Sequence, residues 1–570
     1  MKFGKYLFPL LLLAMVITPR LPGLNSFVAV DEPAWLTRGG NFYYALGQRE
    51  FQNTVYEYHP SVTTMWLVTG ALFAYFPEYR GLGQGYFDVD KEKFDPFLLE
   101  HGKSPMQLLY LSRLFQVAMI ALFALIIYLL LSLLFDEEQA FFVTALVSSA
   151  PYFFGHSRVL SHEGMVAIFV LASILGMVAY LEYDRKWPYL AISAAAAALA
   201  QLTKSSALAM FPVIALILAV SVFEQKKIRG FGYAFLDHLR IFFIWLILLI
   251  IVYVVVWPGM WVAPGKMLYE VYGNAFSYAF QGARLQVTQE LQPSNFGLTS
   301  AGDTIREYTE GLLWRSTPVM WLGVLFAVLA LFRRDRLPTV DVFRKLVFYL
   351  FVNAIMFILL FSLAQGRNSQ HYIMASHVSL DGIAGLGWMM VIEWVTQDWK
   401  TLSAQIIRAG IGLGVIALQL ASALPFYPYY YNYSNPLMET ITGSTLLSDY
   451  GEGFEQAAAY LVKKPGAESL KVLSFRGRGP FSYFFPGETI ILNPLFMEEP
   501  GMGSMIERLR QADYLVFNDA MAERTERSGL FVSALNGVSP EHTIRIKGIY
   551  DIHIYRVADL PPSFYETINQ

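Results

Sequence analysis

The stretch that decides the fold is residues 107–134, which read QLLYLSRLFQVAMIALFALIIYLLLSLL. Arg113 is the one charged residue in this run. Because a membrane-spanning helix needs about 20 predominantly apolar residues, the stretch predicts a helix that crosses a bilayer. Arg113 lies in its first third, where an arginine either extends to the membrane surface or faces a polar partner.

The composition of the whole chain agrees with a membrane protein. Of its 570 residues, 55% are hydrophobic and 15% are charged, whereas soluble domains carry about 25% charged residues. The mean hydropathy is +0.42. A net charge of −3 argues against a nucleic-acid partner. The absence of cysteine excludes disulfides, thiol catalysis and cysteine-bound metal.

Similar apolar segments recur along the chain. About eleven spans, and up to thirteen, are expected from segments near residues 6–20, 107–134, 139–153, 163–181, 188–203, 206–222, 237–257, 316–332, 343–363, 374–395 and 405–424. The first has no small-residue cleavage site after it, so we expect it to be retained as a span. The segment 62–76 is apolar but short.

The distribution of basic residues predicts the orientation of these spans. With the N-terminus in the cytoplasm, the short outer loops hold three basic residues, Arg158, Lys204 and Arg367. The short inner loops hold twelve, namely Arg185, Lys186, Lys226, Lys227, Arg229, Arg240, Arg333, Arg334, Arg336, Arg344, Lys345 and Lys400. This matches the positive-inside rule. A crossing at 62–76 would invert the ratio, so we expect that segment to lie along the outer interface as an amphipathic helix.

This orientation predicts two domains. Residues 1–424 would form the transmembrane domain, with the loops 21–105 and 258–315 outside and interfacial helices in the first of them. Residues 425–570 would form a small extracytoplasmic α/β domain. Its expected elements are a helix at Phe454–Lys463, buried strands at Ser469–Phe475 and Asp513–Phe517, and a hairpin at Thr543–Val557 that turns near Gly548.

The first outer loop opens with an acidic pair, Asp31 and Glu32, followed by Pro33. A solvated loop start or a helix N-terminus would explain the pair. Alternatively, one carboxylate acts as a general base and takes the proton of an attacking hydroxyl. Two neighbouring carboxylates can play different roles, because their surroundings separate their pKa values.

Further polar residues gather at the predicted outer ends of the spans. Each has an ordinary structural explanation, such as a helix start, a loop cap or an interfacial lysine. Together with Arg113 they place several cations and acids on one face, where they could bind a phosphate or a sugar. The candidates are Tyr58, His59, the segment His156–Glu163 with Arg158 and His162, Lys204, and the segment Gly366–Tyr372 with His371.

No group of His, Asp and Glu has a metal-binding spacing, and no glycine pattern for a nucleotide occurs. We therefore expect no cofactor. A divalent cation stays open but has no support in the sequence.

These residues resemble the polyprenyl-phosphate-dependent glycosyltransferases of the GT-C superfamily, closest to the branch of protein O-mannosyltransferases and aminoarabinose transferases. The similarity covers most of the chain. It rests on Asp31-Glu32, Tyr58-His59-Pro60, Ser112-Arg113-Leu114, Ser157-Arg158-Val159-Leu160-Ser161-His162-Glu163, in which Glu163 replaces the usual Asp, and Leu202-Thr203-Lys204. The segment Gln370-His371-Tyr372 departs from the family pattern.

Longer motifs are similar to a bacterial or archaeal subgroup that has an exported C-terminal domain. They are Trp257-Pro258-Gly259-Met260-Trp261-Val262-Ala263-Pro264, Leu313-Trp314-Arg315-Ser316-Thr317-Pro318, Tyr429–Leu437 and Gly451–Ala458.

The resemblance implies an inverting transfer of a sugar, a hexose such as mannose or a similar sugar, from a polyprenyl phosphate to an acceptor hydroxyl outside the membrane. The base would be Asp31, with Glu32 and Glu163 assisting. The donor phosphate would be held by His59, Arg113, Lys204 and His371. The sugar or acceptor would contact Tyr58, Arg158, His162 and Arg315.

The expected partners are the lipid-linked donor, membrane lipids, and a protein, glycolipid or glycan acceptor. Two other functions stay open: a transporter or flippase of lipid-linked sugars, and a non-catalytic sugar-binding assembly protein. A transporter would place charges near the middle of the bilayer and show related halves. Neither feature is evident in the sequence.

Overall fold

The computed structural model describes residues 4–56, 59–89, 91–275, 298–332, 338–364, 369–396, 402–494 and 502–568. The chain divides into two compact units. Unit 1 comprises Met1–Pro22, Arg38–Tyr86 and Ser112–Gly443, and unit 2 comprises Gly23–Thr37, Phe87–Leu111 and Ser444–Gln570. The domain division at residue 424 stays a prediction.

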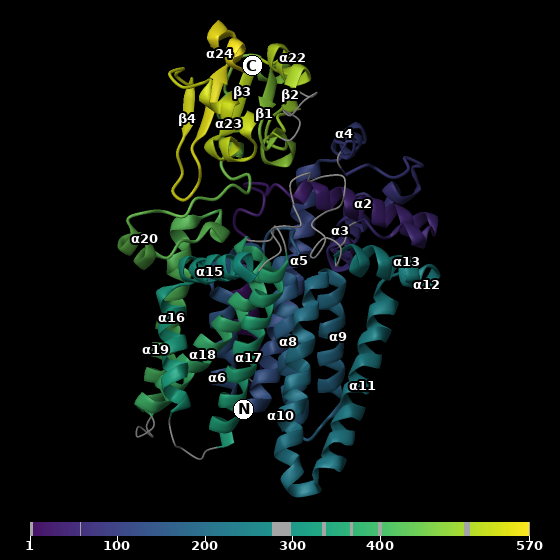
Figure 1. The fold of residues 1–570 in the computed structure, drawn as a ribbon, viewed down its shortest axis with the longest axis vertical. Helices are drawn as coiled ribbons and strands as arrows, with labels where there is room; N and C mark the ends of the chain where they lie inside the picture. The colour runs from purple at the N-terminus through teal and green to yellow at the C-terminus, as the bar shows by residue number, and fades with distance from the viewer. Residues whose placement is uncertain are drawn as a thin grey trace. The chain divides into compact units, whose positions relative to one another are not determined.

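Unit 1 consists mainly of long apolar helices (Figure 1). Among the described residues, seven stretches are long and apolar enough to cross a membrane. They are α5 (Pro105–Leu134), α8 (Glu163–Glu182), Ser205–Arg229 with α10 (Phe211–Arg229), α11 (Phe231–Val256), Val340–Leu363 in α17 (Pro338–Leu363), Gln370–Thr396 with α18 (Met374–Thr396), and Ile406–Phe426 with α19 (Leu402–Ala423).

The remaining predicted spans are also helical, but they are shorter. They are α1 (Gly4–Ile17), α6 (Glu137–Ser149), α9 (Trp187–Thr203) and α16 (Pro318–Leu331). The last becomes part of an eighth stretch if it is joined to α15 (Leu298–Arg315) across a bend of 111°. The helical membrane fold is thus confirmed, and the number eleven stays a prediction.

Helix α8 lies at the centre of the helical packing. In the most apolar stretch of α8, 89% is buried inside the protein, whereas in α11 the buried share is 22%. Helix α8 packs against α9, where a Cβ added to Gly176 would lie 2.9 Å from the backbone nitrogen of Ser193. Small residues therefore let these helices approach closely, as is common in membranes.

Helix α3 (Val62–Tyr75) corrects one expectation. The segment is helical but not amphipathic, because its polar residues Thr63, Thr64 and Thr69 are buried along with most of its apolar ones. Thr63 forms a hydrogen bond of 2.7 Å with Thr203 at the end of α9. The segment is therefore not amphipathic, and its place along the outer interface stays a prediction.

The chain also contains shorter helices. They are α2 (Glu32–Gln48), α4 (Phe94–Glu100), α7 (Pro151–His156), α12 (Gly259–Val262), α13 (Pro264–Leu268) and α20 (Pro436–Thr442).

Unit 2 contains a five-stranded sheet in the order β2-β1-β3-β5-β4. The strands are β1 (Lys471–Ser474), β2 (Glu488–Ile491), β3 (Tyr514–Asn518), β4 (His542–Ile544) and β5 (Ile552–Arg556). Strand β1 pairs in parallel with β2 and β3, while β5 pairs antiparallel with β3 and β4. The helices of this part of the unit are α21 (Phe454–Val462), α22 (Met502–Gln511), α23 (Glu526–Ser533) and α24 (Pro562–Ile568).

The small α/β region is therefore confirmed. The predicted helix is α21, and the first predicted strand contains β1. The second predicted strand covers β3 except for Asn518, and the hairpin is β4–β5, with Gly548 in the left-handed region at φ +76°. Strand β2 was not predicted from the sequence.

Candidate active site

The centre of the candidate site is a buried ion pair. The Lys204 ammonium donates to Oε1 of Glu163 at 2.5 Å, and the two side chains are 1% and 7% exposed. Glu163 begins α8 and Lys204 follows α9 directly. Because successive helices run in opposite directions, the start of one and the end of the other meet at the same end of the helical unit.

Aromatic rings form one wall beside this pair. The ammonium of Lys204 lies 4.6 Å from the ring centre of Tyr372 and 5.5 Å from that of Phe361. The two rings stack on each other with a centroid distance of 5.4 Å. Cation–π attraction strengthens when water is excluded, so the rings favour a charged Lys204.

Two histidines extend the cluster on the side of Glu163. Nε2 of His162 lies 3.9 Å from Oε1 of Glu163, and the His59 ring lies 5.3 Å from the His162 ring. Burial, with Lys204 and Arg38 adding to it, lowers the pKa of His162 well below its ordinary value. His162 is therefore neutral near pH 7 and does not form an ion pair with Glu163.

A second group of aromatic and basic side chains surrounds His156 at the end of α7. Its ring lies 6.0 Å from that of His371 and 5.6 Å from that of Tyr431. Burial, and then the nearby positive charge of Arg315, lowers the pKa of His156 to about 3. The guanidinium of Arg315 lies 5.6 Å from the Tyr152 ring and donates to the carbonyl of Tyr433 at 3.0 Å.

Arg158 has a different environment from its neighbours in sequence. Its guanidinium donates to the backbone carbonyl of Pro22 and, at 3.5 Å, to that of Pro428. It also lies 5.0 Å from the ring centre of Tyr430. These contacts give Arg158 a structural role that joins distant segments of unit 1.

Two polar residues that the sequence did not single out hold the 156–161 segment. Arg20 donates to Oγ of Ser157 at 2.8 Å, and Gln116 donates to the carbonyl of Val159. Arg20 follows the first apolar segment and looks like an ordinary flanking charge. Gln116 lies three residues after the fully buried Arg113 on α5, and a second polar residue inside an apolar run was a usable signal.

The acidic pair belongs to unit 2, at the start of α2. The carboxylate of Asp31 is exposed, whereas Glu32 is buried and accepts a hydrogen bond of 2.7 Å from the backbone N–H of Ala29. Glu32 thus fulfils the ordinary role of a carboxylate at a helix start. Tyr58 lies outside the described residues.

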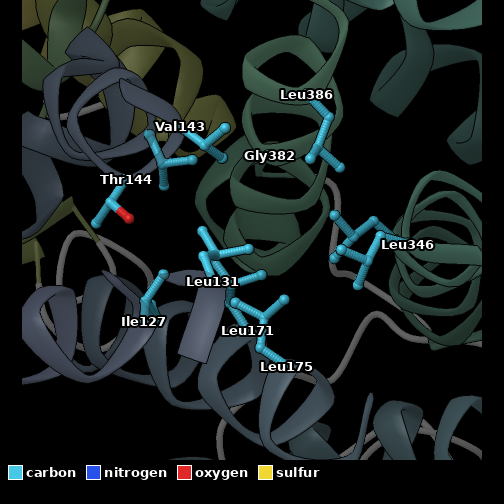
Figure 2. Close-up of a pocket in the computed structure, with 11 residues that line it drawn as sticks. Ile127, Leu131, Val143, Thr144, Leu171, Leu175, Leu346, Gly382 and Leu386 are labelled. Atoms are coloured by element: carbon cyan, nitrogen blue, oxygen red, sulfur yellow. The ribbon is translucent and has the colours of Figure 1, made fainter. Parts of the chain in front are cut away.

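Figure 2 shows an apolar pocket between α5, α6, α8, α17 and α18. Thr144 alone among its lining residues has a polar side chain, and its hydroxyl donates to the carbonyl of Ala140 at 2.8 Å. A phosphate would find no donor there. In the part of the chain that the structure describes, no three His, Asp or Glu residues are placed to hold a metal ion.

Comparison with known proteins gives one family. Residues 110–258 match the model of the family described as "Dolichyl-phosphate-mannose-protein mannosyltransferase". No curated protein matches the chain.

Solved structures with a similar arrangement include ArnT from Cupriavidus metallidurans bound to undecaprenyl phosphate, at 11% identity and a TM-score of 0.47, with 97% of this chain and 99% of that chain covered. Another is the oligosaccharyltransferase of Archaeoglobus fulgidus, at 12% identity and a TM-score of 0.46, with 94% and 71% covered.

The family match contains Arg113, Glu163 and Lys204, three of the residues on which the motif resemblance was built. Over residues 110–258 the chain is therefore similar to the family described as "Dolichyl-phosphate-mannose-protein mannosyltransferase", which agrees with the resemblance seen in its motifs.

Proposed function

We propose that this protein is an inverting membrane glycosyltransferase. It moves a hexose such as mannose, or a similar sugar, from a polyprenyl-phosphate donor to an acceptor hydroxyl on the outer side of the membrane. The observation that carries the proposal is the buried Glu163–Lys204 pair, which lies in the family-matched region. His162 of the same region lies beside the pair, and His59, from outside that region, contacts His162.

The donor phosphate is the natural ligand for the cations of this cluster. As the sugar leaves, negative charge grows on the phosphate, and preset cations in a water-poor site stabilise that charge. In the proposal this work falls to Lys204 and Arg113, with His59 and His371 donating hydrogen bonds. An ammonium has three N–H donors, so Lys204 can bind Glu163 and a phosphate oxygen at once.

Asp31 is the proposed base. It takes the proton of the acceptor hydroxyl while the acceptor oxygen forms the bond to the anomeric carbon and the bond from that carbon to the donor phosphate breaks. Its exposed carboxylate suits that role better than the buried, hydrogen-bonded Glu32. Glu163 keeps Lys204 in place. Tyr58, His162 and Arg315 remain proposed contacts of the sugar or acceptor, and the backbone bonds of Arg158 favour an indirect contribution.

The proposed base can be tested with Asp31→Asn. Loss of a positioned general base reduces rates by roughly 10²- to 10⁴-fold. Membranes that contain the variant should therefore transfer label from radiolabelled polyprenyl-phosphate mannose that much more slowly. Asp88→Asn is the matched control, since Asp88 is a half-exposed surface carboxylate whose ion pair with Lys91 spans 3.6 Å.

Unchanged transfer by Asp31→Asn at normal expression would remove Asp31 from the reaction. A panel of polyprenyl-phosphate sugars, with identification of the labelled product, defines the sugar and the acceptor. Labelled donor that crosses the membrane without a new glycosidic product would support the flippase alternative instead.

A further inference from the structure

The turn that carries Asp31 is tied to the C-terminal part of unit 2. On one side of Asp31, the backbone N–H of Val30 donates to the carbonyl of Tyr450 at 2.9 Å. The loop that provides this carbonyl is itself fixed by Glu452, which accepts from the N–H of Tyr450 at 2.6 Å. The residue before the proposed base is therefore held by a loop from a distant part of the sequence.

On the other side of Asp31, Arg478 binds the N-terminal part of α2. Its guanidinium donates to Oγ1 of Thr37 at 2.7 Å and to the carbonyl of Val89 at 2.9 Å. The Thr37 hydroxyl in turn donates to the carbonyl of Pro33 at 3.0 Å. Arg478 lies between β1 and β2, and it also donates to the carbonyl of Pro33 at 3.5 Å, so its side chain joins the sheet region to the start of α2.

Asp95 balances the charge of Arg478. One carboxylate oxygen of Asp95 accepts from Nε of Arg478 at 3.0 Å, and the other accepts from the hydroxyl of Tyr483 at 3.0 Å. Asp95 is 8% exposed. A largely buried pair with both carboxylate oxygens bound has a fixed geometry, and removal of one partner would leave the other charge poorly solvated.

The backbone of the same loop packs directly on the residues around Asp31. Gly479 has φ +86°, and a Cβ added there would lie 2.3 Å from Cγ of Pro33 and 3.0 Å from Cγ1 of Val28. Glycine is required at Gly479 on both counts, since it tolerates a positive φ and allows the close approach.

We infer that the C-terminal sheet region positions the acidic turn, with Arg478 as the positioning residue that acts on Asp31 through Thr37 and Pro33. The inference rests on the proposed function, in which Asp31 is the base. Arg478 holds the helix start from which Asp31 projects and does not contact the reacting atoms. Because a displacement of about 1 Å can cost roughly 10²-fold in rate, this contact matters for turnover more than for donor binding.

The test compares Arg478→Gln with wild type and with Arg545→Gln. Arg545 is a matched control in the same unit, since its side chain is 78% exposed and pairs with Asp551 in the β4–β5 hairpin. With radiolabelled polyprenyl-phosphate mannose as donor, Arg478→Gln should lower kcat by roughly 10- to 100-fold and leave KM for the donor nearly unchanged. Arg545→Gln should match wild type in both.

A second pair of variants tests the inference even if Arg478→Gln does not fold. Thr37→Val deletes the hydroxyl at nearly constant volume, and Thr37→Ser keeps it. If Arg478 positions Asp31, Thr37→Val lowers kcat and Thr37→Ser restores it. If Arg478→Gln fails to fold, this pair decides: equal kcat for the two variants would overturn the inference.

Asp31→Asn separates this inference from the proposed function. If Asp31→Asn is inactive while Arg478→Gln and Thr37→Val keep the wild-type kcat, only the positioning role fails. If Asp31→Asn itself transfers sugar normally, the proposed function of Asp31 fails first and the positioning role fails with it.

Discussion

At the scale of single residues, the Glu163–Lys204 pair combines a short distance with nearly complete burial. Removing two charges from water costs several kcal/mol per ion, and their attraction repays this only in good geometry. A pair of this kind adds little net stability. It does fix a cation where a phosphate could bind, which is a functional reason for its presence.

Replacing one member of the pair should cost more than replacing both. Lys204→Met leaves a buried carboxylate without its cation, so we expect a loss of about 3–5 kcal/mol in the free energy of unfolding. The double variant Glu163→Gln, Lys204→Met should recover most of that loss. Thermal unfolding in detergent measures both.

Activity provides the control for this comparison. The double variant should transfer sugar far more slowly despite its recovered stability, because the phosphate has lost Lys204, one of its two proposed cations. Wild-type transfer by the stable double variant would show that Lys204 serves only the fold.

At the scale of elements, α16 and α18 meet through glycines. A Cβ added to Gly387 would lie 1.9 Å from the carbonyl oxygen of Gly323, and one added to Gly323 would lie 2.6 Å from that of Ala384. Both obstacles are backbone atoms, so side-chain rotation cannot relieve them. Helix α18 follows directly on His371 and Tyr372, and its position therefore affects the site.

Gly387→Ala should separate the two helices and destabilise unit 1. Forced overpacking costs about 1–3 kcal/mol, so we expect a lower Tm in detergent together with weaker transfer. Gly414→Ala on α19 is the control, because a Cβ there meets nothing within 4 Å. Equal Tm values for the two variants would contradict the close packing of α16 and α18.

At the scale of the whole molecule, the orientation in the membrane is still a proposal: a cytoplasmic N-terminus and an extracytoplasmic C-terminal domain in the cell membrane. The chain contains no cysteine, which allows single-cysteine labelling in an otherwise natural sequence. Glu100 in α4 and Lys227 in α10 are both exposed. The basic residues near Lys227 predict that it faces the cytoplasm.

Glu100→Cys should react with a membrane-impermeant maleimide in intact cells, and Lys227→Cys only after the cells are permeabilised. Labelled protein on a gel measures both, with the cysteine-free parent as the background control. Labelling of both variants in intact cells would reject the predicted orientation.

The sequence by itself determined the membrane class, the helical segments, the small α/β region and the acidic and basic residues that belong to one family pattern. These features depend on local composition and on periodicity, which neighbouring residues determine together. The distribution of basic residues also predicts the orientation that the labelling experiment tests.

Only the tertiary structure decided which of those residues meet. It paired Glu163 with Lys204, gave Arg158 backbone partners, buried the threonines of α3, and joined Arg478 to the turn at Asp31. Residues 37 and 478 are brought together by packing over hundreds of intervening residues. No local pattern encodes such a contact, because its energy depends on the burial and the hydrogen-bond partners that the complete fold provides.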